Sequence, residues 1–376
     1  MYILHVAPFD ASRYPPLINA VHLSAAAGVP SVIVASAPVP SPQVLGDARL
    51  LTVDRRLGGA GQYAYLLRET RAIVRAERPA LIIGHNVRGL SAAALANPPG
   101  GAPIIYHCHD FEDDGDLRSL VLHAGELIAS RRAVEMWVPA IERTTLARKR
   151  HLPAHPLLVQ NCPPRLHALP PKGRLRAWLR AQRTTPGEPR IIIRHGRIGA
   201  SHCILETIEA MPLLPPDVVF VIVGDGDNAY VSECLAAAAR LGLAERLFFH
   251  PFVPHSELTS LLVDASVAMC LYAPLDINAM IPAPNKVFES MAVGLPVVVA
   301  SGNSVSTDVL GAEAGLSVPV GSREALASAL GRLIEDDAFA ARTSRACREA
   351  HLTRFNYETQ LQPTRLGKLL AAAARA

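Results

Sequence analysis

Residues 218–226 read Val-Val-Phe-Val-Ile-Val-Gly-Asp-Gly, an apolar run that ends in a glycine-rich turn. A short, continuous apolar run of this kind is typical of a strand buried on both faces, which occurs in parallel sheets covered by helices. An alanine-rich stretch with helical spacing follows at residues 229–241. The segment therefore predicts a strand, a tight turn and a helix, which is the repeating unit of an α/β fold.

The same alternation of short apolar segments and longer amphipathic segments extends in both directions along the chain. In the second half we expect strands at 190–193, 218–223, 246–249, 267–271, 296–300 and 315–318. In the first half we expect strands at 2–6, 31–35, 50–53, 80–84, 103–107, 135–139 and 157–160. Helices are expected at 16–27, 61–77, 117–132, 175–182, 202–211, 229–241, 254–265, 285–293 and 323–335. The pattern predicts two Rossmann-like, doubly wound parallel-sheet domains that face each other across a ligand cleft at the carboxyl ends of their strands.

The boundary between these domains is expected in residues 163–189, which are rich in proline, arginine and polar residues. We therefore place an N-terminal domain at 1–168 and a C-terminal domain at 169–355. Residues 356–376 have a helical pattern.

Composition excludes several classes of protein. Half of the residues are hydrophobic and 19% are charged, so the chain can bury a large core and is not generally disordered. A net charge of only +4 argues against a nucleic-acid partner. The six cysteines are scattered without a C-x-x-C pair, which disfavours disulfides and zinc and favours a reducing cytoplasm. Because no signal peptide and no membrane-spanning apolar run is evident, we expect a cytoplasmic protein.

The sequence Pro284-Asn285-Lys286-Val-Phe-Glu289 marks a loop that enters a predicted helix. Lys286 and Glu289 are about one turn apart, so both lie on the same helix face. The free N–H groups at a helix N-terminus, the helix dipole and a lysine together suit a diphosphate. Glu289 could hold two ribose hydroxyls, and the alternative is an ordinary surface ion pair.

Two further turns follow predicted strands in the second half. Arg194, Gly196 and Arg197 follow the strand at 190–193, and arginines in such a loop can clamp phosphate through several N–H donors. Gly224 allows close backbone approach at the turn after residue 223. A solvated basic loop and a plain turn are the respective alternatives.

In the first half, His109 and Asp110 follow the predicted strand at 103–107 and are the candidate catalytic residues. A histidine and a carboxylate at a strand end can contact a sugar or assist proton transfer. The loop after the first predicted strand carries the candidate acceptor-binding residues, although simple turn chemistry would also explain them: Asp10, Ser12, Arg13 and Tyr14. One sequential cluster without a second ligand group makes a poor metal site, so no metal is expected.

Two other features bear on partners and cofactors. The basic cluster Arg148-Lys149-Arg150-His151 could bind an anionic membrane surface, such as the inner membrane face. A run of charges of this kind is more often simply solvated. The first turn lacks G-x-G-x-x-G, which disfavours NAD(P). We expect no bound cofactor.

Taken together, residues 190–335 resemble the donor half of the GT-B, family 4-like glycosyltransferases, in a variant with a Pro-Asn-Lys loop. The matching segments are the His-Gly-Arg loop, the Val-Gly-Asp-Gly turn, Phe252-Val253 with Glu257-Leu258, and residues 285–298. The first half matches more loosely, through His109-Asp110 and residues 161–163.

The resemblance implies a bacterial-type retaining transferase that uses a UDP- or GDP-type sugar as co-substrate without a metal. It implies that Arg197 and Lys286 lie at the donor diphosphate, Glu289 at the ribose, Phe252 and Val253 at the base, and His109 at the transferred sugar. It also implies that the helix in 356–376 packs back on the N-terminal domain. The acceptor is left open among a glycan, a lipid-linked intermediate, a natural product and a protein.

Three departures from the family pattern keep other functions open. Ile281 stands at the position of the family's first glutamate, His202 at that of its second phosphate-clamping residue, and Tyr14-Pro15-Pro16 replaces a Gly-Gly turn. One alternative is a catalytically silent subunit that supports a partner transferase. The other is a nucleotide-sugar 2-epimerase, which would act without an acceptor.

Overall fold

The computed structural model describes residues 1–36, 45–52, 59–111, 117–152 and 156–375. It divides into two compact units. The first unit joins Met1–Pro164 to Tyr357–Ala376, and the second unit is Arg165–Asn356.

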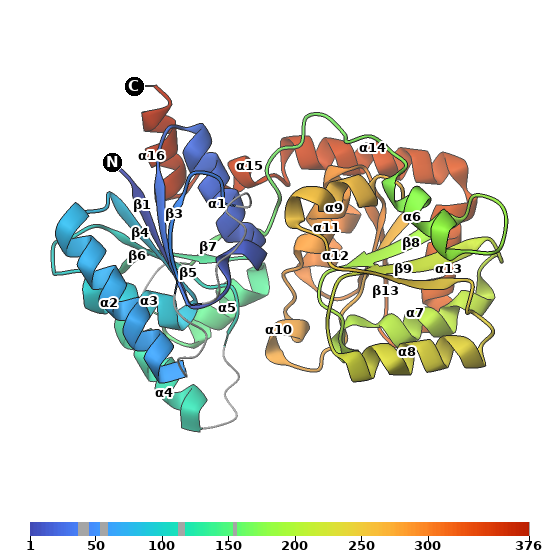
Figure 1. Cartoon of the computed structure of the whole chain (residues 1–376), viewed down its shortest axis with the longest axis horizontal. Coiled ribbons are helices and arrows are strands. Elements are labelled where there is room, and N and C mark those ends of the chain that lie inside the picture. Colours follow the sequence, from blue (N-terminus) through green and yellow to red (C-terminus); the bar gives the residue numbers. More distant parts are fainter. Residues whose placement is uncertain (37–44, 53–58, 112–116, 153–155, 376) are drawn as a thin grey trace. The chain divides into compact units, whose positions relative to one another are not determined.

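The first unit is built on a seven-stranded parallel sheet with the order β3-β2-β1-β4-β5-β6-β7 (Figure 1). Its strands are β1 (Ile3–Ala7), β2 (Ser31–Ala35), β3 (Arg49–Thr52), β4 (Leu81–His85), β5 (Ile104–His107), β6 (Ala133–Val138) and β7 (Pro156–Leu158). Its helices are α1 (Pro15–Ala26), α2 (Gly59–Glu77), α3 (Asn86–Ala96), α4 (Leu117–Ser130), α5 (Ile141–Lys149), α15 (Tyr357–Leu361) and α16 (Arg365–Ala373). A short 3-10 turn lies at Ala11–Arg13.

The second unit is built on a six-stranded parallel sheet with the order β10-β9-β8-β11-β12-β13. Its strands are β8 (Arg190–His195), β9 (Val218–Val223), β10 (Leu247–His250), β11 (Val267–Cys270), β12 (Val297–Ala300) and β13 (Gly315–Val318). Its helices are α6 (Arg174–Gln182), α7 (Ile204–Ala210), α8 (Asn228–Arg240), α9 (His255–Leu262), α10 (Ile277–Met280), α11 (Asn285–Ala292), α12 (Ser304–Gly311), α13 (Arg323–Glu335) and α14 (Asp337–Thr353). Short 3-10 turns lie at Ala200–His202 and Met211–Leu213.

These sheets confirm the predicted fold class of two doubly wound, Rossmann-like parallel-sheet domains. All side chains of β9 are buried, as its unbroken apolar sequence predicts. In each sheet the strand order reverses beside the first strand, between β1 and β4 in one unit and between β8 and β11 in the other. Ligands of such sheets bind outside the carboxyl ends of the strands at this reversal. A ligand site is therefore expected in each unit, at the loops after β1 and β4 in the first unit and after β8 and β11 in the second.

The C-terminal helices belong to the core of the first unit. Tyr357, Leu361 and Leu366 are buried in one apolar cluster with Ile3 of β1 and Leu81 of β4. Figure 1 shows α16, in red, beside the blue α1. The C-terminal segment of the chain therefore packs in the same unit as the N-terminal segment.

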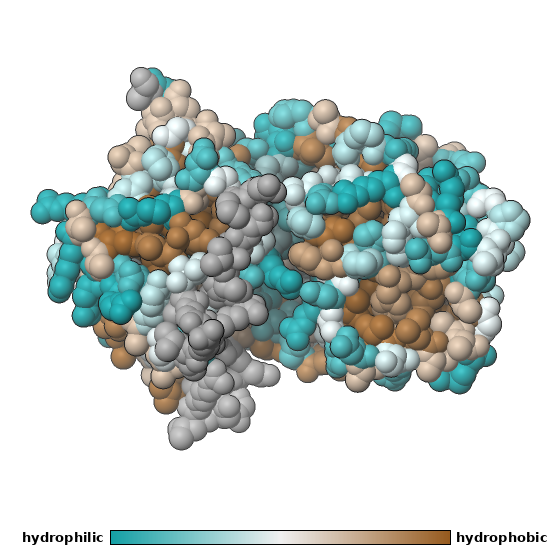
Figure 2. All heavy atoms as spheres, in the orientation of Figure 1, coloured by the Kyte–Doolittle hydropathy of each residue, from teal (hydrophilic) through white to brown (hydrophobic). Residues whose placement is uncertain are grey.

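The surface of both units mixes polar and apolar residues. Figure 2 shows hydrophilic residues interspersed with smaller hydrophobic patches on the visible face, as expected for elements that bury one side and expose the other. Among the described residues, none of the helices has the length and apolar character needed to cross a membrane.

Candidate functional site

In the second unit, the loops after β8 and β9 touch through their backbones. The amide N–H of Gly196 donates to the carbonyl of Val223 at 2.9 Å, and that of Ile198 donates to the carbonyl of Asp225 at 2.9 Å. A Cβ on Gly224, whose φ is 149°, would lie 2.2 Å from the carbonyl oxygen of Gly196. Glycine is therefore required at Gly224 for the two loops to meet, which gives this predicted residue a structural reason.

Lys286 reaches across to the same loop from the first turn of α11. A Cβ on Gly196 would lie 2.9 Å from Cε of Lys286, so the lysine side chain passes directly over this glycine. The ammonium donates to the hydroxyl of Tyr272 at 2.9 Å. The predicted residues Asn285 and Lys286 begin α11, which has neither a side-chain N-cap nor an acidic residue in its first turn. The N–H groups at this helix end therefore keep their capacity to bind an anion.

Arg194 was predicted to clamp phosphate from a loop, but its side chain is almost entirely buried, with 2% exposure. Its Nη1 and Nη2 atoms have no hydrogen-bond partner among the described residues. Burial lowers the pKa of this guanidinium. The charges of Arg194 and Lys286, added to burial, also lower the pKa of His202 to about 2. A buried cation without a carboxylate is costly unless an anion pairs with it.

Glu289 lies inside this cationic region and is itself 5% exposed. Its Oε2 lies 2.7 Å from Nε2 of His195, and its Oε1 lies 3.4 Å from Nδ1 of His255. Burial alone would raise the pKa of Glu289, but the hydrogen bond from His195 and the nearby His255 and Lys286 outweigh it and leave the pKa lowered. Burial lowers the pKa of His195 as well, so an ionised carboxylate accepts a hydrogen bond from a neutral imidazole.

The remaining predicted residues of the second unit have side chains that are more exposed to solvent. Arg197 is exposed in the loop after β8. Phe252 is 45% exposed, and Val253 next to it is half-buried. His255, which pairs with Glu289, begins the helix α9 that follows them.

In the first unit, His109 follows β5 and is buried. Its Nε2 lies 3.0 Å from Nδ1 of His85, at the end of β4, and Nε2 of His85 lies 3.2 Å from Nδ1 of His5 in β1. The ring of His107 packs on His109 with the centroids 3.8 Å apart. Burial is the main cause that lowers the pKa of each of these four histidines, to about 3 for His5 and His107.

The backbone around His109 is held by two polar side chains. Oδ1 of Asn86 accepts the N–H of His109 at 2.8 Å and that of Asp110 at 3.3 Å. Asn86 has a φ of 50°, a left-handed conformation that asparagine tolerates better than most residues. The buried Arg143 donates to the carbonyl of His109 and lies 3.6 Å from the carboxylate of Asp110. The side chain of Asp110 is 61% exposed and thus available to a ligand.

The predicted acceptor-binding residues divide into two groups. Oδ1 of Asp10 accepts from the backbone N–H of Ser12 at 3.0 Å and from its hydroxyl at 2.5 Å, and Asp10 lies 4.0 Å from Arg13. These contacts stabilise their own 3-10 turn, as simple turn chemistry predicts. Tyr14 instead packs its ring edge-on against His109, with the centroids 4.1 Å apart.

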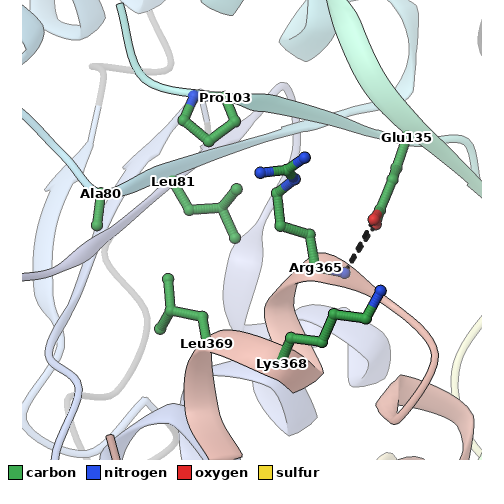
Figure 3. Close-up of a pocket in the computed structure, with 7 residues that line it drawn as sticks. All are labelled: Ala80, Leu81, Pro103, Glu135, Arg365, Lys368 and Leu369. Atoms are coloured by element: carbon green, nitrogen blue, oxygen red, sulfur yellow. Dashed lines mark hydrogen bonds between the residues drawn. The ribbon is translucent and has the colours of Figure 1, made fainter. Parts of the chain in front are cut away.

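A hollow of about 390 Å³ lies beside this pair and is lined by Pro8, Phe9, Tyr14, Asn86, Val87, Arg88 and Asp110. It brings together two predicted residues, Tyr14 from the segment after β1 and Asp110 from the segment after β5, with residues that follow β4. A second hollow, of about 410 Å³, is drawn in Figure 3 and lined by Ala80, Leu81, Pro103, Glu135, Arg365, Lys368 and Leu369. It lies near the starts of β4, β5 and β6, so it is remote from the predicted site residues of the same unit, which follow the carboxyl ends of strands.

Among the described residues, one group of side chains has the spacing of metal ligands. His85, His107 and His109 each offer a nitrogen, and these atoms lie within 4.8 Å of one another. In the sequence only His107 and His109 stand together, and the fold adds His85 from the neighbouring strand. His85 and His109 already share a hydrogen bond, however, which a cation would have to replace.

Several residues of both sites were not predicted as functional. His5, His85, Asn86 and Arg143 surround His109, and His195, His255 and Tyr272 surround Glu289 and Lys286. A signal was present for His85, Asn86 and Tyr272, because each stands where a predicted strand ends. No signal marked Arg143, which lies inside a helix.

Comparison with known proteins identifies a domain in the second unit. Residues 176–350 match the family model described as "Glycosyl transferases group 1", so this part of the chain is similar to that family. It is 28% identical over 185 residues to the glycogen synthase of Mycobacterium tuberculosis (strain CDC 1551 / Oshkosh), which covers 48% of this chain and 42% of that protein. It is 29% identical over 189 residues to the D-inositol 3-phosphate glycosyltransferase of Xylanimonas cellulosilytica, which covers 48% and 43%. The matches therefore span less than half the length of these relatives.

Among solved structures, Anabaena Alr3699/HepE in complex with UDP-glucose is similar over 99% of this chain and all of that one. The TM-score is 0.78 and the sequence identity is 19%. At this identity the similarity concerns the fold, and it confirms the predicted GT-B architecture of two parallel-sheet domains.

Proposed function

We propose that this protein is a glycosyltransferase that moves a sugar from a nucleotide-diphosphate sugar to an acceptor. The observation that carries the proposal is the buried guanidinium of Arg194, whose Nη atoms have no partner among the described residues. Its charge acts on His202 together with that of Lys286, which lies at the uncapped start of α11. These three sources of positive potential belong to the loop after β8 and to the start of α11, and Lys286 lies directly over Gly196 of that loop. A diphosphate has the charge and the oxygen acceptors to pair with all of them.

The chemistry assigned to this site is electrostatic. The positive charge of Lys286 and the helix end stabilise the negative charge that develops on the leaving diphosphate as the bond to the sugar breaks. Because these groups neutralise the diphosphate, we propose that the transfer needs no metal, and by resemblance that it retains the anomeric configuration. Glu289 has acceptor capacity left on both oxygens and is assigned to the ribose.

We propose a UDP-type donor, which the UDP-glucose complex of Alr3699/HepE supports. Phe252 offers an exposed ring on which a base can stack. In the first unit, His109 is assigned to the transferred sugar, and the hollow lined by Tyr14 and Asp110 to the acceptor.

The test is a turnover assay with radiolabelled UDP-glucose, UDP-galactose and GDP-mannose in EDTA, with lipid-linked, glycan and small-molecule acceptors. Sugar incorporation that needs an acceptor supports the proposal. Lys286→Ala is expected to lower kcat/KM about tenfold or more, since a charge-assisted hydrogen bond contributes about 1.5–3 kcal/mol.

Lys172→Ala is the matched control because Lys172 is an exposed lysine of the same unit. Its activity should equal that of the wild type. Sugar epimerisation without acceptor would replace the proposal by an epimerase, and nucleotide binding without any turnover would replace it by a silent subunit.

A further inference from the structure

Three buried histidines of the first unit form a continuous hydrogen-bonded row. His5 bonds through Nδ1 to Nε2 of His85, and His85 bonds through Nδ1 to Nε2 of His109. The row crosses three adjacent strands or their ends, from β1 through β4 to the second residue after β5. Each ring thus uses a defined nitrogen, which restricts where its proton can be.

Counting protons leaves only two arrangements of this row. Burial lowers the pKa of all three imidazoles, so each is neutral near pH 7 and carries one N–H. Each hydrogen bond needs one proton between its two nitrogens. The protons must therefore all point toward His109, leaving an N–H on its Nδ1, or all point toward His5, leaving an N–H on its Nε2.

The two ends of the row lie in different surroundings. Nδ1 of His109 and Nε2 of His5 are both buried without a hydrogen-bond partner among the described residues. His5 is fully buried in the sheet, whereas His109 contacts Tyr14 at the edge of the hollow. A buried N–H without an acceptor is rarer than an under-used acceptor. The donor therefore belongs at His109, where a ligand can pair with it.

We propose that His5 and His85 are positioning residues that hold His109 in the tautomer with its proton on Nδ1. His109 then presents an N–H donor, already oriented, to an oxygen of the bound substrate. The tautomer follows from the row itself, and its use on a sugar substrate rests on the proposed function.

His107 provides a control for packing alone. Its ring lies against His109, yet no hydrogen bond joins His107 to His109 in the part of the chain that the structure describes. His107→Leu therefore removes a buried imidazole from the same surroundings and leaves the row intact.

The test is nitrogen-detected NMR of the whole protein labelled with 15N-histidine, in EDTA and without substrate. Protonated and bare ring nitrogens have well-separated shifts, and the spectrum of His109→Asn identifies the signals of His109 among the 14 histidines. We expect a protonated Nδ1 and a bare Nε2 on His109 in the wild type. A protonated Nε2 on His109 would overturn the proposal without the need for any variant.

The variants then test transmission along the row. His85→Leu and His5→Leu should both shift the nitrogen signals of His109 toward the other tautomer, although His5 does not touch His109. His107→Leu should leave those signals in place. Unchanged nitrogen signals of His109 in a folded His5→Leu protein would overturn the proposal that His5 acts on His109 through His85.

Kinetics separate this inference from the proposed function. With a donor and acceptor that support transfer, kcat should fall about tenfold in His85→Leu, as expected when one hydrogen bond to the reacting group is lost, and stay near the wild-type value in His107→Leu. An inactive wild type would contradict the proposed function, while the NMR result still decides the tautomer. An active wild type with unchanged kcat in His85→Leu would overturn the positioning role alone.

Discussion

At the scale of single residues, the site combines charges that the protein leaves unpaired with charges that it pairs internally. Arg194 has two buried nitrogens without a partner among the described residues, whereas both carboxylate oxygens of Glu289 meet histidines. Sequence could place Lys286 and Glu289 on one helix face because that depends on local spacing. It could not show that His195 and His255 hold the carboxylate, because those contacts join segments distant in the chain.

The buried histidines make the first unit sensitive to acid. Folding lowers the pKa of His5 and His107 from 6.5 to about 3, so between these values the unfolded chain binds more protons than the folded chain. Stability therefore rises with pH across this window and is lost as the pH falls below about 6.5. The expected loss is about 1.4 kcal/mol per pH unit for each such histidine.

The measurement is urea unfolding at pH 7, 6 and 5 in a Trp178→Phe background, which leaves Trp137 of β6 as the reporter of the first unit. His107→Leu should reduce the number of protons taken up on unfolding, which sets the pH dependence of the free energy of unfolding, by about one. An unchanged dependence in that variant would show that His107 is not neutral in the folded protein.

At the scale of elements, strands were predicted better than helices. Every predicted strand overlaps an observed one, because buried parallel strands are short apolar runs with clear boundaries. Helices α3, α5, α10, α12 and α14 were not predicted. Helix α3 begins at Asn86 directly after β4, without the loop or capping residue that would mark its start. Helix α5 buries only Arg143 and Ala147 and lacks an apolar stripe.

The contact between the loops after β8 and β9 predicts the effect of adding one methyl group. Gly224→Ala should lower the free energy of unfolding of the second unit by about 1–3 kcal/mol and weaken UDP binding, because the new Cβ would collide with the carbonyl of Gly196. Gly242→Ala is the control, since Gly242 also has a positive φ, of 67°, but a Cβ there would meet nothing within 4 Å. Calorimetric UDP titration should find normal affinity in Gly242→Ala. Wild-type affinity in Gly224→Ala would refute the claim that the contact between the two loops shapes the UDP site.

At the scale of the whole molecule, the chain completes its first unit with its last helices. Leu366 of α16 is fully buried with residues of β1 and β4. Helical spacing in the tail was evident from sequence. The partner of that helix was expected only from the resemblance, because a local pattern does not indicate which distant surface it covers.

Leu366→Ala should therefore destabilise the first unit by about 2–5 kcal/mol through the cavity it leaves. Lys368→Ala, an exposed change in the same helix, should have little effect. Unfolding followed through Trp137 should shift in Leu366→Ala, and unfolding followed through Trp178 in the second unit should not. A shift of the Trp178 transition alone would contradict the assignment of α16 to the first unit.

The function proposed for the whole chain depends on a diphosphate bound in the second unit between Arg194, Lys286 and the start of α11. Isothermal titration in EDTA with UDP, uridine and inorganic diphosphate tests this binding mode. We expect that UDP binds much more tightly than uridine, that inorganic diphosphate competes with UDP, and that Lys286→Ala weakens UDP about tenfold or more while Lys172→Ala does not. Equal affinity for UDP and uridine, or UDP binding that is unchanged in Lys286→Ala, would contradict it.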